Sequence, residues 1–284
     1  MSIHAQVSAA RLRLREAGIT PTESDLDARL LAQHVLGWTT ERFLTDAREP
    51  VPDGFTPRYE SLVARRVTRE PLAYITGVRE FWGLELEVGP DVLIPRPATE
   101  LIVEAVQQLF PDRAVPLHIA DVCTGCGCVA VAIAHERPSA RISALDISRP
   151  ALDVATRNAA RHGVSGRVTF AHGDLLDGVT GTFDAIVANP PYVVDRARPA
   201  LQPEVRDHEP SVALFGGVDG LGLVARLVDT APARLRPGGY LIFEFGLGQD
   251  VEVEDLIEAS PDLTLIDLRR DLQGIARTAI ARRT

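Results

Sequence analysis

The amino-acid sequence predicts an α/β protein with a doubly wound, mostly parallel sheet, preceded by a small N-terminal helical domain. From residue 117 onward, apolar runs of strand length alternate with helical patterns, which is typical of a parallel sheet with helices on both faces. Residues 1–78 show apolar residues at helical spacing instead. A chain of 284 residues is long enough to hold both domains.

The composition is that of a soluble globular protein, with 45% hydrophobic and 24% charged residues. No apolar run reaches the length of a membrane span, and the N-terminus lacks the apolar core of a signal peptide. The three cysteines lie within residues 123–128, unlike the spaced cysteines of a secreted disulfide framework. We therefore expect a cytoplasmic protein that binds no membrane.

The charge balance argues against a protein that wraps nucleic acid. The net charge is −9, whereas binding the phosphate backbone requires a basic surface. All 30 basic residues are arginine, so chemistry that uses a lysine side chain is excluded. We expect no direct contact with nucleic acid.

In the helical domain, Ser24 and Asp27 resemble a capping arrangement at the start of a helix. Apolar residues at helical spacing follow, namely Leu26, Leu30, Leu31 and Val35. A further helix is expected along Tyr59, Leu62, Val63 and Val67. No catalytic constellation occurs here, so this bundle either presents a binding surface to a partner or is a structural cap.

Residues 79–97 change to a two-residue period and predict a β-hairpin that links the domains. Leu84, Leu86 and Val88 alternate with glutamates, and a Gly89–Asp91 turn precedes Val92–Ile94. The segment then reaches Arg96 between two prolines. Arg96 either lines a cleft or is a solvated arginine of the linker.

The domain at 98–284 begins with a helix and continues with strands. The expected strands are Leu117–Val122, Arg141–Leu145, Val168–Ala171, Phe183–Ala188 and Tyr240–Phe245. Two last apolar runs, Leu263–Leu268 and Ile275–Ile280, predict an antiparallel hairpin at the edge of the sheet.

Directly after the fourth of these strands stands Asn189-Pro190-Pro191-Tyr192. Each proline fixes its own φ and lacks a backbone donor, so nearby carbonyls remain free to accept hydrogen bonds. The Asn189 oxygen is a further acceptor and Tyr192 offers an aromatic face. The run suits gripping a flat –NH2 group, which makes Asn189, Pro190 and Tyr192 the candidate catalytic residues. The alternative is a strand end capped by prolines.

The turn from Asp121 to Cys128 predicts a nucleotide site. Its glycines allow close approach of a ligand to the backbone, and the following helix points free N–H groups at it. Asp146 ends the next strand, where an acid typically binds ribose hydroxyls, and Asp174 is placed to accept from an adenine amino group. The predicted cofactor-binding residues are Asp121, Cys123, Thr124, Gly125, Cys126, Gly127, Asp146, Asp174, Leu175 and Asn189.

Which nucleotide binds depends on the charge of the turn. Gly125-x-Gly127-x-x-Ala130 also satisfies the relaxed dinucleotide fingerprint, so a protein that binds NAD remains an alternative. Asp121, however, would repel a pyrophosphate and could orient a cationic aminoacyl group. The acidic residues fit the sulfonium of S-adenosylmethionine better than the phosphates of NAD. The three cysteines lack the fourth ligand that structural zinc needs, and we expect no metal.

Taken together, these motifs resemble those of class I S-adenosylmethionine-dependent methyltransferases that act on amino groups. More narrowly, the chain resembles the bacterial release factor glutamine methyltransferases, which belong to the protein-(glutamine-N5) methyltransferases. Further stretches similar in order and spacing are Asp27–Gly37, Arg69–Gly77, Leu93–Pro97, Glu209–Gly217 and Pro237–Glu244. There are two departures: the family has glycine at the position of Cys123 and an acid at that of Ala98. The Cys-Thr-Gly turn is more similar to the related enzyme that methylates a large-subunit ribosomal protein.

The resemblance implies a seven-stranded Rossmann-like methyltransferase sheet and, as cofactor, S-adenosylmethionine that leaves as S-adenosylhomocysteine. It further implies methylation of the glutamine amide nitrogen in the Gly-Gly-Gln motif of class I peptide chain release factors, in translation termination. The substrate-binding residues would be Arg96, Asn189, Pro190, Pro191 and Tyr192, and the helical domain would recognise the substrate. A ribosomal-protein glutamine and an adenine amino group of nucleic acid remain alternative acceptors. We expect a monomer.

Overall fold

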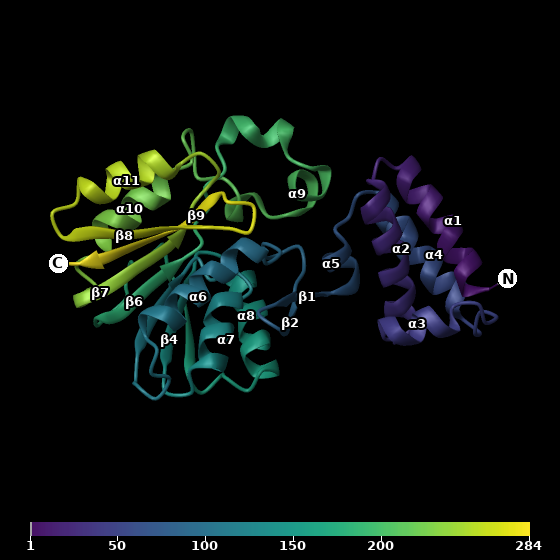
Figure 1. The fold of residues 1–284 in the computed structure, drawn as a ribbon, viewed down its shortest axis with the longest axis horizontal. Helices are drawn as coiled ribbons and strands as arrows, with labels where there is room; N and C mark the ends of the chain where they lie inside the picture. Colours follow the sequence, from purple (N-terminus) through teal and green to yellow (C-terminus); the bar gives the residue numbers. More distant parts are fainter. Residues whose placement is uncertain (1) are drawn as a thin grey trace. The chain divides into compact units, whose positions relative to one another are not determined.

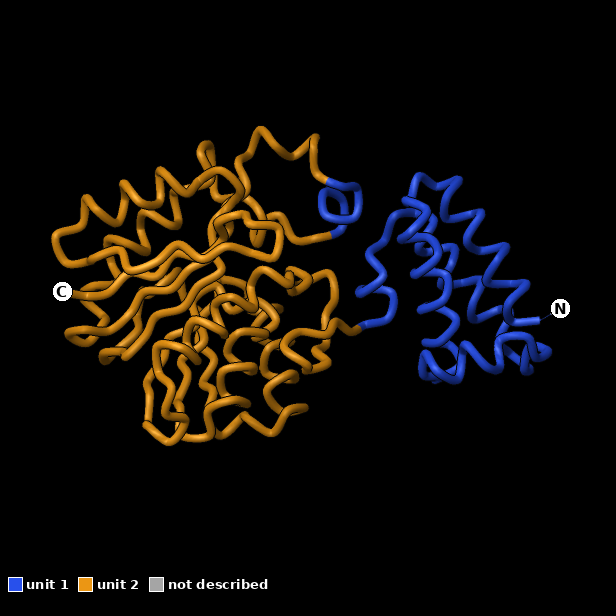
Figure 2. The backbone as a smooth tube through the Cα atoms, in the orientation of Figure 1, with its two compact units in different colours: residues 1–77, 202–208 blue, residues 78–201, 209–284 orange. Residues whose placement is uncertain are grey.

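The protein, described by a computed structural model over residues 2–284, divides into two compact units (Figure 2). Unit 1 contains residues 1–77 and 202–208, and unit 2 contains residues 78–201 and 209–284. Segment 202–208 therefore belongs to the helical unit although it comes from the second half of the chain. Each unit has its own apolar core, and the two are described separately below.

Unit 1 is built of helices. They are α1 Ile3–Glu16, α2 Pro21–Leu36, α3 Thr40–Asp46, α4 Phe55–Val67, α5 Leu72–Thr76 and α9 Pro203–His208. Helix α2 begins where the Thr20 hydroxyl accepts from the Glu23 backbone N–H and lies 2.7 Å from the Glu23 carboxylate, a capping arrangement. It ends at Gly37, whose φ of 64° only glycine adopts readily.

The predicted cap at Ser24 and Asp27 is wrong, because α2 already begins at Pro21, three residues before Ser24. The Ser24 hydroxyl donates to the Ile19 carbonyl, and Asp27 is paired with Arg66 instead. The predicted apolar face is confirmed for Leu31 and Val35 but not for Leu26, which is 43% exposed.

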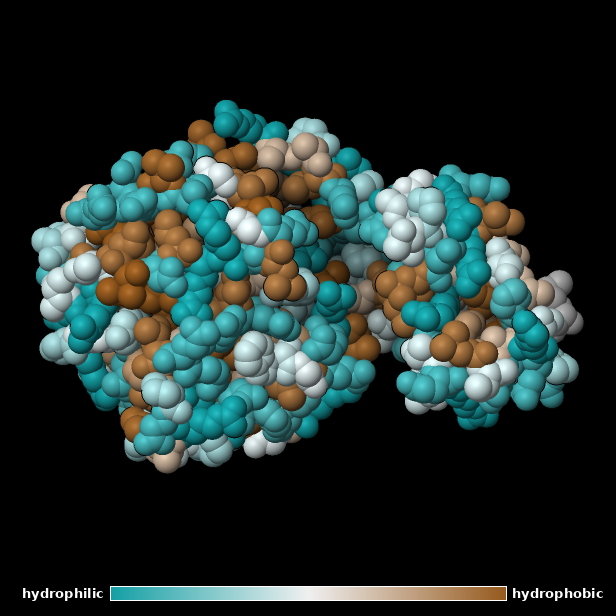
Figure 3. All heavy atoms as spheres, in the orientation of Figure 1, coloured by the Kyte–Doolittle hydropathy of each residue, from teal (hydrophilic) through white to brown (hydrophobic). Residues whose placement is uncertain are grey.

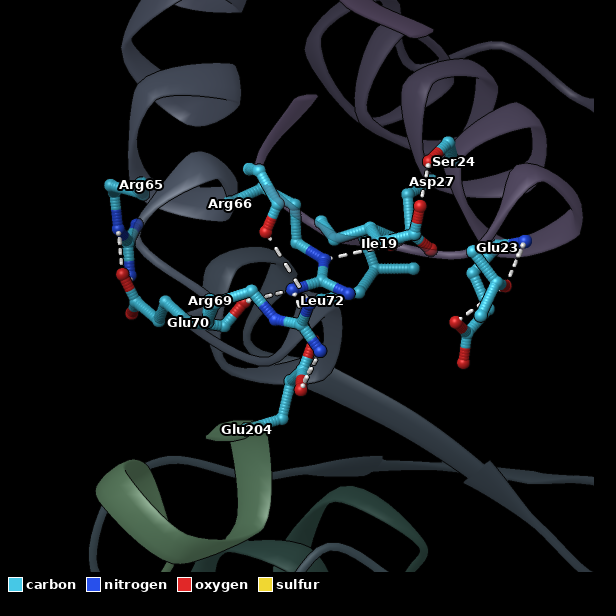
Figure 4. A network of polar contacts seen from close by, with 12 residues as sticks. Ile19, Glu23, Ser24, Asp27, Arg65, Arg66, Arg69, Glu70, Leu72 and Glu204 are labelled. Atoms are coloured by element: carbon cyan, nitrogen blue, oxygen red, sulfur yellow. Dashed lines mark hydrogen bonds and ion pairs between the residues drawn. The ribbon is translucent and has the colours of Figure 1, made fainter. Parts of the chain in front are cut away.

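A buried ion network holds segment 202–208 in unit 1 (Figure 4). Arg66 on α4 lies 2.7 Å from Asp27 on α2 and 2.8 Å from Glu204 on α9, and its side chain is only 5% exposed. Arg69 lies 2.6 Å from the other oxygen of Glu204. Burial opposes ionisation of Glu204, but the hydrogen bonds from Arg69 and Arg66 lower its pKa overall. Burial raises the pKa of Asp27 even though Arg66 acts in the opposite direction.

Unit 2 contains a seven-stranded sheet in the order β5-β4-β3-β6-β7-β9-β8. Its strands are β3 His118–Val122, β4 Arg141–Asp146, β5 Val168–His172, β6 Phe183–Ala188, β7 Leu235–Glu244, β8 Leu263–Arg270 and β9 Ala276–Arg283. Strands β3 to β7 pair in parallel, and β9 is antiparallel to both β7 and β8. This confirms the predicted fold class and the C-terminal hairpin.

Helices cover both faces of this sheet (Figure 1). They are α6 Glu100–Leu109, α7 Cys128–Glu136 and α8 Arg149–Arg161 on one face, and α10 Gly222–Thr230 and α11 Asp250–Glu258 on the other. The short turns η1 Pro97–Thr99, η2 Asp195–Ala200 and η3 Ser211–Ala213 lie in the connections. The central strands are buried on both sides, which explains their nearly continuous apolar sequences.

The hairpin before the sheet differs from the prediction. Its strands are β1 Val78–Phe81 and β2 Leu84–Glu87, and Phe81 pairs with Leu84. The hairpin turn is Trp82-Gly83, with φ of 55° and 72°. The predicted turn at Gly89–Asp91 is present, with the Val92 N–H donating to the Gly89 carbonyl, but it lies after the hairpin and was wrongly assigned to it. Trp82 concealed the hairpin turn, because a bulky residue with positive φ is uncommon.

No helix among residues 2–284 is both long and apolar enough to cross a membrane. On the face drawn in Figure 3, hydrophilic residues cover most of each unit. Hydrophobic residues form smaller groups among these hydrophilic residues. The most exposed large apolar side chains include Leu272 and Val218, both in loops.

We predict that Arg66→Met destabilises unit 1 by about 3–5 kcal/mol, because it leaves the Asp27 and Glu204 carboxylates buried without their shared cation. Its neighbour Arg65 forms a surface pair with Glu70, so Arg65→Met is the matched control and should cost about 0.2–1 kcal/mol. Urea unfolding followed by Trp38 fluorescence in a Trp82→Phe background measures unit 1 alone. Equal midpoints for the two variants would contradict a structural role for the network.

Candidate active site

The register of the parallel strands brings the predicted residues to one edge of the sheet. Val122 of β3 pairs with Leu145 of β4 and with Ala188 of β6, so these three strands end level. The residues at or just after the ends of these strands, Cys123, Asp146 and Asn189, therefore meet. A cavity of about 310 Å³ opens at this edge, within unit 2.

Most of the predicted cofactor-binding residues line this cavity. They are Asp121, Cys123, Thr124, Gly125, Cys126, Asp146, Asp174, Leu175 and Asn189, joined by Pro191 from the predicted substrate site. Gly127, Pro190, Tyr192 and Arg96 are not among the lining residues. The sequence reasoning missed other parts of the lining, among them Asp91, Val92, Thr99, Cys128, Ile147, Val212, Phe215 and Arg226.

Asp121 holds the glycine-rich turn onto the start of α7. One carboxylate oxygen accepts from the Thr124 hydroxyl at 2.6 Å and from the Ala130 backbone N–H at 3.1 Å. The residue is 2% exposed, and burial raises the pKa of its carboxyl to about 7. Asp121 is thus a buried acid whose charge depends on what occupies the cavity, since a nearby cation favours the ionised form.

The two glycines of the turn have different surroundings. A Cβ at Gly125 would meet open space, as expected where the backbone faces a ligand cavity. A Cβ at Gly127 would lie 3.0 Å from the Ala155 side chain of α8, so this glycine allows two helices to pack closely. Cys123 also has a positive φ, of 58°, at the position where the resembled family has glycine.

Asp146 is placed between the turn and the next helix. One oxygen accepts from the Gly125 N–H at 2.8 Å and the other from the Ser148 N–H at 2.9 Å. Burial raises the pKa of this carboxyl, although these backbone hydrogen bonds act in the opposite direction. Each oxygen retains a further lone pair, so Asp146 can accept from two neighbouring hydroxyls while it fixes the turn.

Asp174 forms an ion pair that the sequence did not reveal. Its carboxylate lies 2.9 Å from the Arg226 guanidinium on α10, and both side chains are more than 40% exposed. Among residues 2–284, Arg226 is the only basic residue in the lining, which also contains Asp91, Asp121, Asp146 and Asp174. The cavity is therefore acidic, as suits a cationic ligand rather than a pyrophosphate.

At the mouth, Asn189 begins a chain of buried hydrogen bonds. Its amide nitrogen donates to the Thr99 hydroxyl at 3.1 Å, and that hydroxyl donates to Glu244 at 2.7 Å. The Tyr192 hydroxyl donates to the other oxygen of Glu244 at 2.7 Å. Thr99 and Glu244 are each 1% exposed. Neither was predicted, because each is far from Asn189 in the sequence and becomes a neighbour only through the fold.

The backbone around Asn189-Pro190-Pro191-Tyr192 is held from the loop that follows it. A Cβ on Gly216 would clash with the Pro191 carbonyl and one on Gly220 with the Tyr192 carbonyl, so only glycine allows this approach. Gln249 also donates to the Tyr192 carbonyl, at 3.2 Å. No hydrogen bond within the described part of the chain reaches the Pro190 carbonyl, which remains available as an acceptor.

Arg96, predicted to contact substrate, is paired with Glu209. Its guanidinium donates to this carboxylate at 2.5 Å, and the second oxygen accepts from the Ile94 N–H at 3.3 Å. Glu209 is buried and Arg96 is one-third exposed. Arg96 thus secures the segment before Thr99, and its predicted contact with substrate stays a prediction.

The three cysteines are free thiols, and Cys126 is buried. Burial raises the pKa of the Cys123 thiol well above its usual range, which makes it a poor nucleophile. Within residues 2–284 no group of three or more His, Cys, Asp or Glu side chains is arranged to hold a metal ion.

Two regions of the sequence match known family models. Residues 7–77 match the family described as the PrmC N-terminal domain, and residues 96–204 match the methyltransferase small domain. A release factor glutamine methyltransferase of Neisseria gonorrhoeae is 40% identical over 260 residues, which cover 90% of this chain and 93% of that protein. That of Rhodospirillum rubrum is 42% identical over 272 residues, covering 95% and 82%.

Solved structures agree on the fold at much lower identity. The catalytic domain of hMettl16, solved in complex with the MAT2A 3′UTR hairpin 6, has a TM-score of 0.58 and 16% identity, covering 76% of this chain and 81% of that one. A methyltransferase from Pyrococcus furiosus has a TM-score of 0.52 and 18% identity, covering 77% and 96%. The sheet of unit 2 is therefore a methyltransferase sheet.

We predict that Asp121 makes unit 2 less stable as the pH rises towards 7. Its pKa is about 7 when folded and near 3.9 in an unfolded chain, so the folded state retains a proton that the unfolded state has released. The stabilisation is complete below about pH 4 and is lost as the pH rises through the folded value. Between pH 5 and 7, the ligand-free wild type should lose about 2 kcal/mol relative to Asp121→Asn. Urea unfolding at several pH values, followed by Trp82 in a Trp38→Phe background, measures this difference. Parallel curves would show that the carboxyl is not protonated in this range.

Proposed function

Because the chain belongs to the release factor glutamine methyltransferase family, we propose that it methylates the glutamine of the Gly-Gly-Gln motif in class I peptide chain release factors. The methyl group leaves the sulfonium of S-adenosylmethionine and bonds to the side-chain amide nitrogen, which gives up one N–H proton to solvent. S-adenosylhomocysteine is the product.

The observation that carries this proposal is a pair of acceptors, the side-chain oxygen of Asn189, which lines the cavity, and the carbonyl of Pro190, the next residue. The Asn189 amide nitrogen is engaged with Thr99, so its oxygen faces away from that hydroxyl. No hydrogen bond among residues 2–284 reaches this oxygen or the Pro190 carbonyl. A primary amide has two N–H groups, and two adjacent acceptors suit it.

The acidic cavity supports S-adenosylmethionine as the methyl donor. Asp146 would bind the ribose hydroxyls, Asp174 would face the adenine amino group, and Asp121 would lie near the aminoacyl end. When bound, S-adenosylmethionine supplies the methyl group on a sulfonium, which is a good leaving group. The surplus of carboxylates over the single Arg226 favours such a cation over the phosphates of NAD.

The protein's own residues overcome the low reactivity of an amide nitrogen, whose lone pair is delocalised into the carbonyl. Asn189 and Pro190 accept the two N–H bonds, orient the nitrogen and stabilise the positive charge that develops on it. Tyr192, fixed by Glu244, packs on the plane of the amide. Burial raises the pKa of Tyr192, which keeps its hydroxyl protonated and bound to Glu244.

The protein substrate also needs contacts outside the cavity. Two glycines beside the glutamine offer few side-chain contacts and lose much conformational entropy on binding. We assign the missing affinity to the helical unit, predicted from the sequence to recognise the substrate. Because the proposed substrate is a release factor of translation termination, the proposed location of the reaction is the cytoplasm. The monomeric state and the absence of direct nucleic-acid binding stay predictions.

We predict that the enzyme with S-adenosylmethionine adds one methyl group to the Gly-Gly-Gln glutamine of a folded class I release factor. Asn189→Ala should still bind S-adenosylmethionine and lose about 10²–10³ in turnover, as expected when one preorganised polar contact is removed. Mass spectrometry of the intact and digested release factor identifies the site, and single-turnover kinetics measures the loss. Unchanged single-turnover methylation by Asn189→Ala would contradict the proposal that Asn189 accepts a hydrogen bond from the substrate amide.

The same assay separates the alternative substrates. A large-subunit ribosomal protein methylated far faster than any release factor would show that Cys123 and Ala98 indicate the substrate better than the rest of the chain. Methylation of adenine in an oligonucleotide would show that Asn189-Pro190-Pro191-Tyr192 serves a base instead.

We predict that Asp146→Ala weakens binding of S-adenosylmethionine by about 2–3 kcal/mol, because charge-assisted hydrogen bonds to the ribose are lost. Asp146→Asn is the control, since it keeps one acceptor oxygen and most of the volume, and its loss should be smaller. Titration calorimetry measures both affinities. An affinity for Asp146→Ala equal to that of the wild type would mean that the ribose is held elsewhere.

A further inference from the structure

The side-chain amide of Asn189 needs one particular orientation to act on a substrate amide. Its oxygen must face the substrate, because its –NH2 group would meet the –NH2 group of the substrate with donor against donor. The two orientations have nearly the same shape, so packing alone does not choose between them. Some hydrogen-bond partner must do so.

The buried hydrogen bonds that connect Asn189 to Thr99 and Glu244 select this orientation. Glu244 has no ion-pair partner among residues 2–284, and it receives two hydrogen bonds, from Thr99 and from Tyr192, each 2.7 Å long. Burial raises the pKa of Glu244, and the hydrogen bonds that it accepts from Thr99 and Tyr192 act in the opposite direction. In its carboxylate form Glu244 can only accept, so the single proton of the Thr99 hydroxyl points at it. Toward Asn189 that hydroxyl can then only accept.

The Thr99 oxygen lies 3.1 Å from the Asn189 side chain, within hydrogen-bond distance. Only the –NH2 group of Asn189 can donate to an oxygen whose proton is already used. The opposite orientation would place two acceptor oxygens against each other in a site that is 1% exposed at Thr99 and at Glu244. The Asn189 oxygen is thereby directed away from Thr99.

We propose that Glu244 and Thr99 are positioning residues that fix the orientation of the Asn189 side-chain amide for catalysis. This inference rests on the proposed function, because the oxygen of Asn189 is taken to accept from a substrate –NH2 group. Both act on the substrate through Asn189, although Thr99 also lines the cavity. Glu244 acts through Thr99 on Asn189, and it also secures Tyr192.

The first test uses a matched pair at one position. Thr99→Val keeps the shape but removes the hydroxyl, and Thr99→Ser keeps the hydroxyl. We expect Thr99→Val to lower kcat about tenfold, since one orienting hydrogen bond is lost, with the KM for release factor and the Kd for S-adenosylmethionine within twofold of wild type. Thr99→Ser should restore most of the kcat. A change in KM alone, or equal activity of the two variants, would overturn the proposal.

A double-mutant cycle with Asn189→Ala separates positioning from general damage. If Thr99 acts through Asn189, then Thr99→Val should cost almost nothing further once Asn189 is alanine. A structural defect would instead lower the activity by the same factor in both backgrounds, and that additive result would overturn the proposal.

Glu244→Met provides a second variant, needed if Thr99→Val fails to fold and bind S-adenosylmethionine. Methionine is close in size to glutamate but has no oxygen acceptor, so the Thr99 hydroxyl loses the acceptor that directs its proton. We expect a lower kcat with an unchanged Kd for S-adenosylmethionine. A wild-type kcat would overturn the proposal. These outcomes differ from failure of the proposed function, in which the wild type itself would methylate no release factor.

Discussion

The level ends of strands β3, β4 and β6 are the constraint on which the site depends. The hydrogen-bond ladder fixes Val122 against Leu145 and Ala188, so the residues that follow each strand share one edge. A slip of one residue would move a strand by about 3.3 Å and turn its side chains to the opposite face. The geometry around Asp146 and Asn189 is thus set by apolar residues such as Ile119 and Ile186, buried in the middle of the sheet.

Two buried carboxylates hold together the segments that the strand ends bring close to one another. Asp121 receives the Thr124 hydroxyl and the Ala130 N–H, and Glu244 receives the hydroxyls of Thr99 and Tyr192. Neither acid forms an ion pair within residues 2–284, and burial raises the pKa of both. Each accepts from groups in two different segments and holds them together. Hydrogen bonds rather than opposite charge offset the cost of burying these acids.

The sequence predicted what local patterns determine. The parallel strands were evident from apolar runs, and Asp146 and Asn189 from their positions at the ends of those runs. The sequence did not predict side-chain interactions between residues that are far apart along the chain. The sequence indicated a helix cap at Asp27, whereas in the fold Asp27 pairs with Arg66. The pairing of Asp174 with Arg226 joins residues 52 positions apart. Thr99 and Glu244, which are 145 positions apart, left no local signal at all. The turn at Trp82 was missed because a positive φ at tryptophan runs against its usual preference.

The helical unit is not one continuous stretch of sequence, and this affects how the protein can evolve. Arg66 and Arg69 lie in its first part, whereas Glu204 comes from helix α9, encoded more than 130 codons later. A recombination event that moved residues 1–77 alone onto another methyltransferase would transfer the two arginines without their carboxylate. Position 204 should therefore be inherited together with positions 66 and 69, and a lineage that loses one of the three should show compensating changes at the others.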